Sequence, residues 1–276
     1  MLLPCHVHNG YFTTNDSDPT ASAGTSVTSG NANTYGTWTQ IHAGFTYAIT
    51  LVDINITNLG ANNNNKNCYI DIGIGSSSST VCTLIEKLGG VGAAPGLGIT
   101  YLLPIRIPPD TPVWARHQNV AASAVAGVQI TVHGGNQNIW TMPTISQVVA
   151  LGATTASTVG TTLTVGSENS YGSYTQIVAS TTTDYAGCLI SWFNTGITHT
   201  ANTVYTFDVA LGDSGQEKLI GPRITTGSSV NSNEQFAIVC NPIYIGIPAG
   251  SRLSVRGKCS GTPVTNSSVI INAFTH

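Results

Sequence analysis

The sequence contains few charged side chains, because only 8% of its 276 residues are Asp, Glu, Lys or Arg, against about 25% in a typical soluble domain. Its polar surface must therefore come mainly from Ser, Thr, Asn and Gly. The net charge of -3 provides no basic field for phosphates, which argues against binding to nucleic acid. A neutral surface rich in hydroxyl and amide groups suits lasting contact with other proteins, or work outside a cell.

Long apolar runs are also absent. No stretch is long enough to span a membrane as a helix. The segment from Met1 to His8 lacks the basic start and the extended apolar core of a signal peptide. We therefore expect no membrane partner and synthesis in a cytoplasm, with release by another route, such as lysis, if the protein ends up outside the cell.

The six cysteines form no C-x-x-C pair and do not align between the two halves of the chain. This pattern argues against a disulfide framework or a shared zinc site, so we expect free thiols throughout. Cys5, His6 and His8 could supply three metal ligands, but structural zinc sites need four. The other interpretation is an arm that happens to carry them, and no cofactor is expected.

Motifs for catalysis are missing as well. None of the seven histidines has a counterpart in the other half, and no G-x-S-x-G nucleophile elbow occurs. Asp71 and Asp208 are repeated carboxylates, but each lies in its own half, so they would not flank one glycosidic bond. We expect a protein without enzymatic activity, and a hydrolase ranks behind the two binding functions considered below.

What the sequence does contain is a repeat. The stretch Tyr35-Gly36-Thr37-Trp38-Thr39-Gln40-Ile41 returns as Tyr171-Gly172-Ser173-Tyr174-Thr175-Gln176-Ile177. The matching segments, in pairs, are 24–41 with 160–177, 69–75 with 206–212, and 105–116 with 245–256. The offset drifts from about 136 to about 140 residues, as expected when loops vary in length and strands do not. We infer an internal duplication.

Short runs rich in β-branched and aromatic residues alternate with clusters of Gly, Asn and Ser, and helical periodicity is nowhere sustained. This pattern predicts an all-β fold of two tandem antiparallel β-sandwich domains, similar to jelly rolls. Residues 1–18 would form an extended arm, residues 19–134 the first domain, residues 135–152 a linker and residues 153–276 the second domain.

Period-two alternation assigns the faces of the predicted strands. Asp71 and Arg116 should point away from the core of the first domain, and Asp208 and Arg256 away from the core of the second. Each Asp should then lie near its Arg across neighbouring strands. Trp114 falls on the same outward face as Arg116, and an exposed Trp is the kind of residue that anchors an interface.

The predicted interface residues differ between the halves. Trp114 has Ser254 as its counterpart, so one domain would anchor the chain while the other faces outward or bridges. Tyr11 and Phe12 lie in the arm, which we expect to be ordered by contact with another chain or with the second domain. Trp140 lies in the apolar linker, which should pack along both domains or add an edge strand.

Trp38 and Tyr174 occupy equivalent positions of the repeat. Two interpretations are open for them, a shared aromatic platform for a sugar ring or a packing role in both halves. The packing role is favoured.

Three segments, Tyr171–Ile177, Asp71–Gly75 and Ile247–Arg256, resemble a recurring pattern in virion proteins of tailed bacteriophages. They are similar to β-sandwich or jelly-roll modules of capsid decoration (cement) proteins and tail fibres. The resemblance implies a structural virion protein whose partners are the major capsid protein, other virion proteins and further copies of itself as a trimer or dimer. A decoration protein is the first expectation. The alternative is a tail fibre or receptor-binding component that contacts a host glycan or protein.

Overall fold

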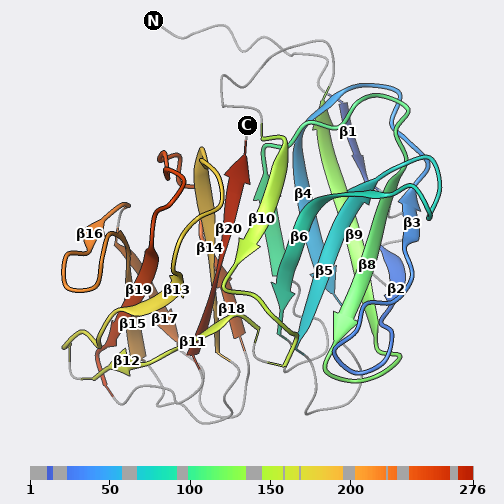
Figure 1. Cartoon of the computed structure of the whole chain (residues 1–276). Helices are drawn as coiled ribbons and strands as arrows, with labels where there is room; N and C mark the ends of the chain where they lie inside the picture. The colour runs from blue at the N-terminus through green and yellow to red at the C-terminus, as the bar shows by residue number, and fades with distance from the viewer. Residues whose placement is uncertain are drawn as a thin grey trace, which may run out of the picture.

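A computed structural model of the chain consists of strands and loops (Figure 1), and no residue that it describes is helical. No helix in this part of the chain could cross a membrane. The described residues are 11–14, 24–57, 67–91, 99–134, 145–157, 159–167, 169–194, 203–221, 223–228, 236–261 and 267–275. We call residues 11–134 the first half and residues 145–275 the second half.

The strands form three sheets, of five, nine and six strands. Sheet A contains β1 (Tyr11–Thr14), β2 (Thr25–Thr28), β4 (Ile49–Thr57), β7 (Ile99–Leu103) and β9 (Val125–Gly134). Sheet B contains β3 (Thr39–His42), β5 (Cys68–Ile74), β6 (Cys82–Gly90), β8 (Val113–Asn119), β10 (Gln147–Leu151), β11 (Thr161–Leu163), β14 (Gly187–Asn194), β18 (Phe236–Val239) and β20 (Ser267–Thr275). Sheet C contains β12 (Val165–Gly166), β13 (Thr175–Val178), β15 (Thr203–Leu211), β16 (Lys218–Leu219), β17 (Ile224–Ser228) and β19 (Leu253–Cys259).

The order of strands places residues of both halves in one sheet. Sheet A runs β1-β9-β4-β7, with β2 also on β9. Sheet B runs β18-β14-β20-β10-β6-β5-β8-β3, with β11 on β20. Sheet C runs β12-β19-β15-β16, with β13 on β19 and β17 on β15. The predicted all-β, β-sandwich class is confirmed.

Two hydrophobic cores lie on opposite faces of sheet B. Along β20, Ile270 and Phe274 belong to the core that sheet A covers, which we call the first core. The alternate residues Val269, Ile271 and Ala273 belong to the core that sheet C covers, the second core. Because successive side chains of a strand point to opposite faces, the three sheets form layers in the order A, B, C.

The two halves repeat the same pairing order. β3 pairs with β8 as β13 pairs with β19, and both pairs contain an irregularity, after Gln40 and after Gln176. β5 pairs with β8 as β15 pairs with β19. The duplication and the division into two domains remain predictions, and both halves contribute strands to sheet B.

The predicted linker contains a strand inside sheet B. Residues Gln147–Leu151, as β10, pair antiparallel with β20 and touch β6 in parallel, with Val148 opposite Ile85. This segment therefore joins the halves as an internal strand, where we expected lateral packing or an edge strand. Trp140 lies outside the described residues.

The predicted arm contributes a strand to its own chain. Residues Tyr11–Thr14 form β1, which pairs antiparallel with β9, with Tyr11 opposite Gly134 and Phe12 opposite His133. The alternative that the second domain orders Tyr11 and Phe12 is therefore wrong, since they pair with a strand of their own half, and contact of this segment with another chain stays a prediction. The physical reason is that the end strand of a sheet offers a row of backbone groups to any extended segment nearby. The remaining predicted arm residues lie outside the described part of the chain.

A buried histidine makes stability depend on pH. His117 is fully buried and its Nδ1 lies 3.2 Å from the carbonyl oxygen of Val27. Burial lowers the pKa of His117 from its usual 6.5 to about 4. On acidification the unfolded chain therefore takes up a proton before the folded chain does. The stabilisation is complete above pH 6.5 and is lost as the pH falls toward 4.

We expect the free energy of unfolding to fall by about 2 kcal/mol between roughly pH 7 and pH 5 through this residue. Urea denaturation of the wild type and of His117→Gln at both pH values measures the effect. The variant should lose less stability on acidification than the wild type does. Equal losses in the two proteins would contradict the assignment.

Candidate functional site

An outward-facing group of four side chains, the first cluster, lies on β5, β8 and the segment before β3. The Arg116 guanidinium donates to Asp71 Oδ2 through Nε at 2.9 Å and Nη2 at 2.7 Å. The Tyr35 hydroxyl donates to Asp71 Oδ1 at 2.8 Å. The Arg116 guanidinium also lies 4.3 Å from the ring centre of Tyr35 and 4.6 Å from that of Trp38. The carboxylate is 3% exposed.

The same arrangement occurs in the second half as the second cluster. Arg256 donates to Asp208 Oδ2 through Nε at 3.1 Å and Nη2 at 3.0 Å. The Tyr171 hydroxyl donates to Asp208 Oδ1 at 3.2 Å. The Arg256 guanidinium lies 4.3 Å from the ring centre of Tyr171 and 4.5 Å from that of Tyr174. The structure thus brings together both pairs that alternation predicts.

Strand register builds the clusters. Asp71 lies directly opposite Arg116 in the β5–β8 pair, and Asp208 lies opposite Arg256 in the β15–β19 pair. The repeated Tyr-Gly segment then folds over each pair. A Cβ on Gly36 would collide with the carbonyl oxygen of Thr28, so the backbone approaches closely only because this residue is glycine.

The two clusters differ in how the second carboxylate oxygen is satisfied. Asp71 Oδ1 accepts the backbone N–H of Lys87 at 2.7 Å, whereas Asp208 Oδ1 accepts Nε of Arg223 at 2.9 Å. The Lys258 ammonium also lies 5.0 Å from the ring centre of Tyr171. The second cluster therefore gathers more positive charge than the first.

Protonation in the clusters follows from burial and charge. Burial alone would raise the pKa of Asp208, but hydrogen bonds from Arg223 and Arg256 hold that pKa below its usual value. Burial, and then the charge of the neighbouring Asp, raises the pKa of Tyr35 and of Tyr171. At neutral pH the tyrosines are therefore donors and Asp208 is ionised. The groups satisfy one another, so the clusters are better suited to holding a surface in shape than to proton transfer.

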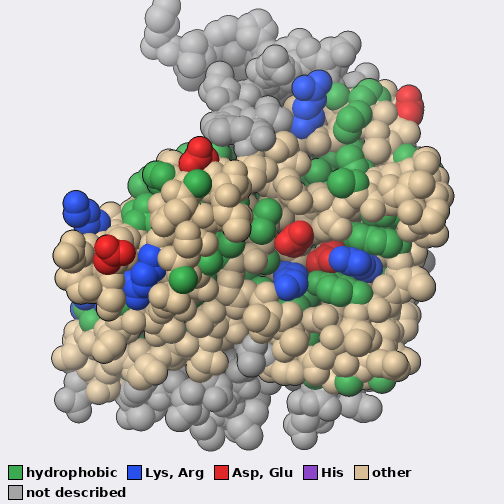
Figure 2. Space-filling view, in the orientation of Figure 1, with side chains coloured by type: hydrophobic (Ala, Val, Ile, Leu, Met, Phe, Trp, Pro, Cys, Tyr) green, Lys and Arg blue, Asp and Glu red, His purple; other side chains and the backbone are tan. Residues whose placement is uncertain are grey.

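Charged side chains are sparse on the face of the molecule seen in Figure 2, where several of them lie in small groups of both signs amid uncharged atoms. This distribution agrees with the low charge of the sequence. It leaves a largely neutral surface for contact.

Trp114 is not the exposed anchor that period-two alternation predicts. It is 9% exposed, and its indole Nε1 donates to the carbonyl oxygen of Gly75 at 2.7 Å. It does lie on the predicted face, opposite Gly73, but the Trp38 ring packs against Gly73 on that face. Period-two alternation correctly predicts the face of β8 on which Trp114 lies, but it does not predict which residues cover that face.

Replacing Trp114 with Phe should lower the free energy of unfolding by about 1 kcal/mol, because one buried hydrogen bond is lost. Urea denaturation measures the change. Leu102→Ala, at an exposed position of β7, serves as a control with a smaller expected effect. If Trp114→Phe is as stable as the wild type, the indole contributes no such bond.

The other predicted residues have different outcomes. Tyr11 and Phe12 lie on β1, and Trp140 lies outside the described residues. Trp38 and Tyr174 are half-buried against an arginine, which favours a packing role over a sugar platform.

The five described cysteines carry no disulfide, and no metal-binding group occurs among the described residues. Cys5, His6 and His8 lie outside that part of the chain.

Sequence reasoning missed four side chains of the clusters, including Lys258 beside Tyr171. Tyr35 and Tyr171 were visible as an in-register repeat but had no assigned role. No repeated residue in the first half pointed to Arg223, because the two halves align poorly between β16 and β17.

No protein-family model matches the chain, and no curated protein matches it. Among solved structures it is similar to the N-terminal CBM22-1-CBM22-2 tandem domain from Paenibacillus barcinonensis Xyn10C, with a TM-score of 0.24 and 9% identity over 92% of this chain and 99% of that one. A fucolectin from striped bass (Morone saxatilis) serum has a TM-score of 0.22 and 11% identity over 96% of this chain and 95% of that one. Infectious bursal disease virus, Gx strain, has a TM-score of 0.21 and 12% identity over 97% of this chain and 71% of that one. At such TM-scores these likenesses carry no argument about function.

Proposed function

We propose that this chain is a non-enzymatic structural protein of a virus particle, a decoration protein that binds to the capsid of a tailed phage. The observation that carries the proposal is the pair of equivalent outward clusters held in one body. Sheet B contains strands of both halves, so it fixes the spacing between the clusters. Two alike surfaces at a fixed spacing suit a lattice that offers two alike sites, and binding both multiplies a weak affinity.

The surface chemistry supports the same function. In each cluster the carboxylate is paired with arginine and tyrosine. Few charges are left to repel a partner or to attract nucleic acid, and the surface is rich in hydroxyl and amide groups. Such a surface favours lasting protein contact with the major capsid protein or another virion protein.

The number of copies per particle tests the proposal. Quantitative mass spectrometry of purified particles of the virus that encodes the chain should give a number comparable to that of the major capsid protein. A copy number equal to a small multiple of the tail symmetry would contradict decoration and favour a tail component. Absence from the particles would contradict both.

The second candidate function is a tail fibre or receptor-binding component. The second cluster favours it, because Arg223, Arg256 and Lys258 surround the half-buried ring of Tyr171. Cationic and aromatic groups together suit a host sugar that carries a carboxylate. Binding to a glycan array with sialylated and neutral members tests this function, and selective retention of the acidic glycans is the result it requires.

A further inference from the structure

The contact between the two halves uses a different surface on each. The first half contributes the β6 side of sheet B, where Ile85 lies opposite Val148 of β10. The second half contributes β10 and the face of β14 and β20 that looks into the first core. There Phe193 and Ile270 come so close to Gly89 that a Cβ would not fit. A contact between unlike surfaces is heterologous, so it leaves one copy of each surface unused when the unit is repeated.

The repeated pairing order identifies the unused copies. β1 pairs with β9 as β10 pairs with β20, with Tyr11 opposite Gly134 and Gln147 opposite Thr275. β1 is an end strand of sheet A. The sequence match of Leu84 with Leu219 places β16, an end strand of sheet C, where β6 lies in the first half. β16 lies at one end of the molecule and β1 lies well away from it (Figure 1).

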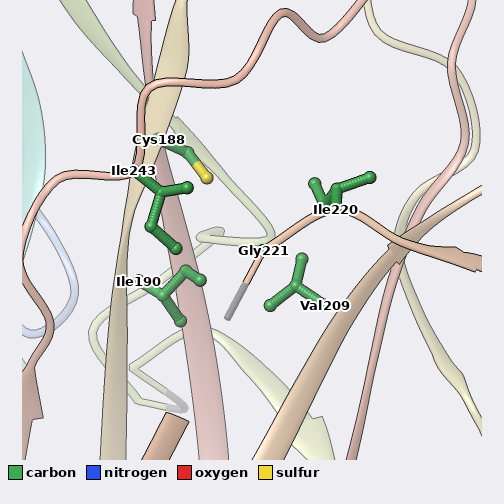
Figure 3. Close-up of a pocket in the computed structure, with 6 residues that line it drawn as sticks. All are labelled: Cys188, Ile190, Val209, Ile220, Gly221 and Ile243. Carbon is green, nitrogen blue, oxygen red and sulfur yellow. The ribbon is translucent and has the colours of Figure 1, made fainter. Parts of the chain in front are cut away.

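The β16 end of the second half exposes an apolar side chain whose counterpart is covered in the first half. Leu219 is 49% exposed, whereas its counterpart Leu84 is 8% exposed. Inward of this strand, a narrow apolar pocket between sheets B and C (Figure 3) is too small to hold a water molecule, and it is lined by Cys188, Ile190, Val209, Ile220, Gly221 and Ile243. About half of the Leu219 side chain at this end therefore remains in contact with water in the single chain.

We propose that a second copy of this chain covers the β16 end. Its β1, with the adjoining outward face of sheet A, takes the place that β10 and β20 take against the first half. In the parallel register of Val148 with Ile85, Gln147 lies opposite Leu84, so Tyr11 of the second copy lies opposite Leu219. The assembly is head-to-tail, and it closes into a ring or continues as a chain according to the rotation at each contact.

The contact between copies is weaker than the contact within the chain. In β9, Gln129 and His133 stand on the outward face, where β20 has Ile270 and Phe274. Covering Gln129 and His133 removes less apolar surface from water than covering Ile270 and Phe274 does. Association should therefore be reversible and depend on protein concentration. This self-association is independent of which virion protein the chain binds.

Disulfide trapping tests the predicted pairing directly. Tyr11→Cys and Leu219→Cys are made separately in a Cys5→Ser, Cys82→Ser background, because Cys82 is exposed and Cys5 lies in the undescribed arm. Mild oxidation of the mixture should give a covalent dimer that contains one chain of each variant, identified by the mass of the linked peptides. Neither variant alone should give a comparable yield. No mixed dimer, or a dimer of Leu219→Cys alone, would overturn the proposal.

Oligomer mass provides a second readout. Native mass spectrometry and light scattering of the full chain over a concentration series should show reversible association. Leu219→Asp should raise the dissociation constant by roughly tenfold or more. The matched control is Val204→Asp, since Val204 is 45% exposed near the start of β15. A wild type that stays monomeric throughout, or equal weakening by both variants, would overturn the proposal.

Discussion

Replacing Asp208 with Asn should lower the free energy of unfolding by about 3 kcal/mol at neutral pH. The Asp208 side chain is fully buried and accepts hydrogen bonds from Arg256, Arg223 and Tyr171. Removing one partner of a buried ion pair costs about 3 to 5 kcal/mol, because the remaining charge stays desolvated. The lower end applies here, since both arginines keep part of their surface in water. Urea denaturation measures the change.

The matched control for this variant is Arg223→Ala. The Arg223 side chain is half exposed, so solvent screens its contact and its loss should cost much less than the loss of the Asp208 carboxylate. Asp208 then still keeps the bidentate contact with Arg256. If Asp208→Asn and Arg223→Ala cost the same, the carboxylate does not organise the second cluster.

Replacing Phe193 with Ala should cost about 3 to 5 kcal/mol, the range for removing a fully buried aromatic side chain. Phe193 lies on β14 in the second half but belongs to the first core, where it packs against Gly89 of β6. The residue therefore holds the two halves together, and its loss leaves a cavity at their junction.

Hydrogen exchange measured by mass spectrometry shows which strands of the Phe193→Ala variant lose amide protection. Because the halves share sheet B, slow amides of β4 in the first half and of β15 in the second half should lose protection together. Leu102→Ala, at an exposed position of β7, should change neither. Loss of protection confined to one half would show that the junction does not couple them.

Period-two alternation and the repeat were sufficient to predict the sandwich class and the Asp–Arg pairs. Asp71 and Asp208 alternate with apolar residues that face a core, so their faces follow from local sequence. The covering of those faces is a tertiary property. Trp114 is buried because a segment distant in sequence folds over its strand, and no local pattern contains that information.

The junction and parts of the clusters were beyond prediction for a related reason. The apolar pattern of β10 predicts a strand, but it does not reveal that its neighbours are β6 and β20. Lys87 reaches Asp71 with its backbone N–H, and it has a positive φ of 47° at an irregularity in the β5–β6 pairing. Because every residue except proline has a backbone N–H, such a contact cannot be predicted from the amino-acid type at that position.

The two halves share sheet B and should therefore unfold as one unit, which is the condition for presenting two clusters at a fixed spacing. Differential scanning calorimetry of the intact chain, at a concentration where it is monomeric, tests this most directly. We expect a single transition whose calorimetric enthalpy equals its van't Hoff enthalpy. Two resolved transitions, or a calorimetric enthalpy well above the van't Hoff value, would show that the halves unfold independently and would contradict the account.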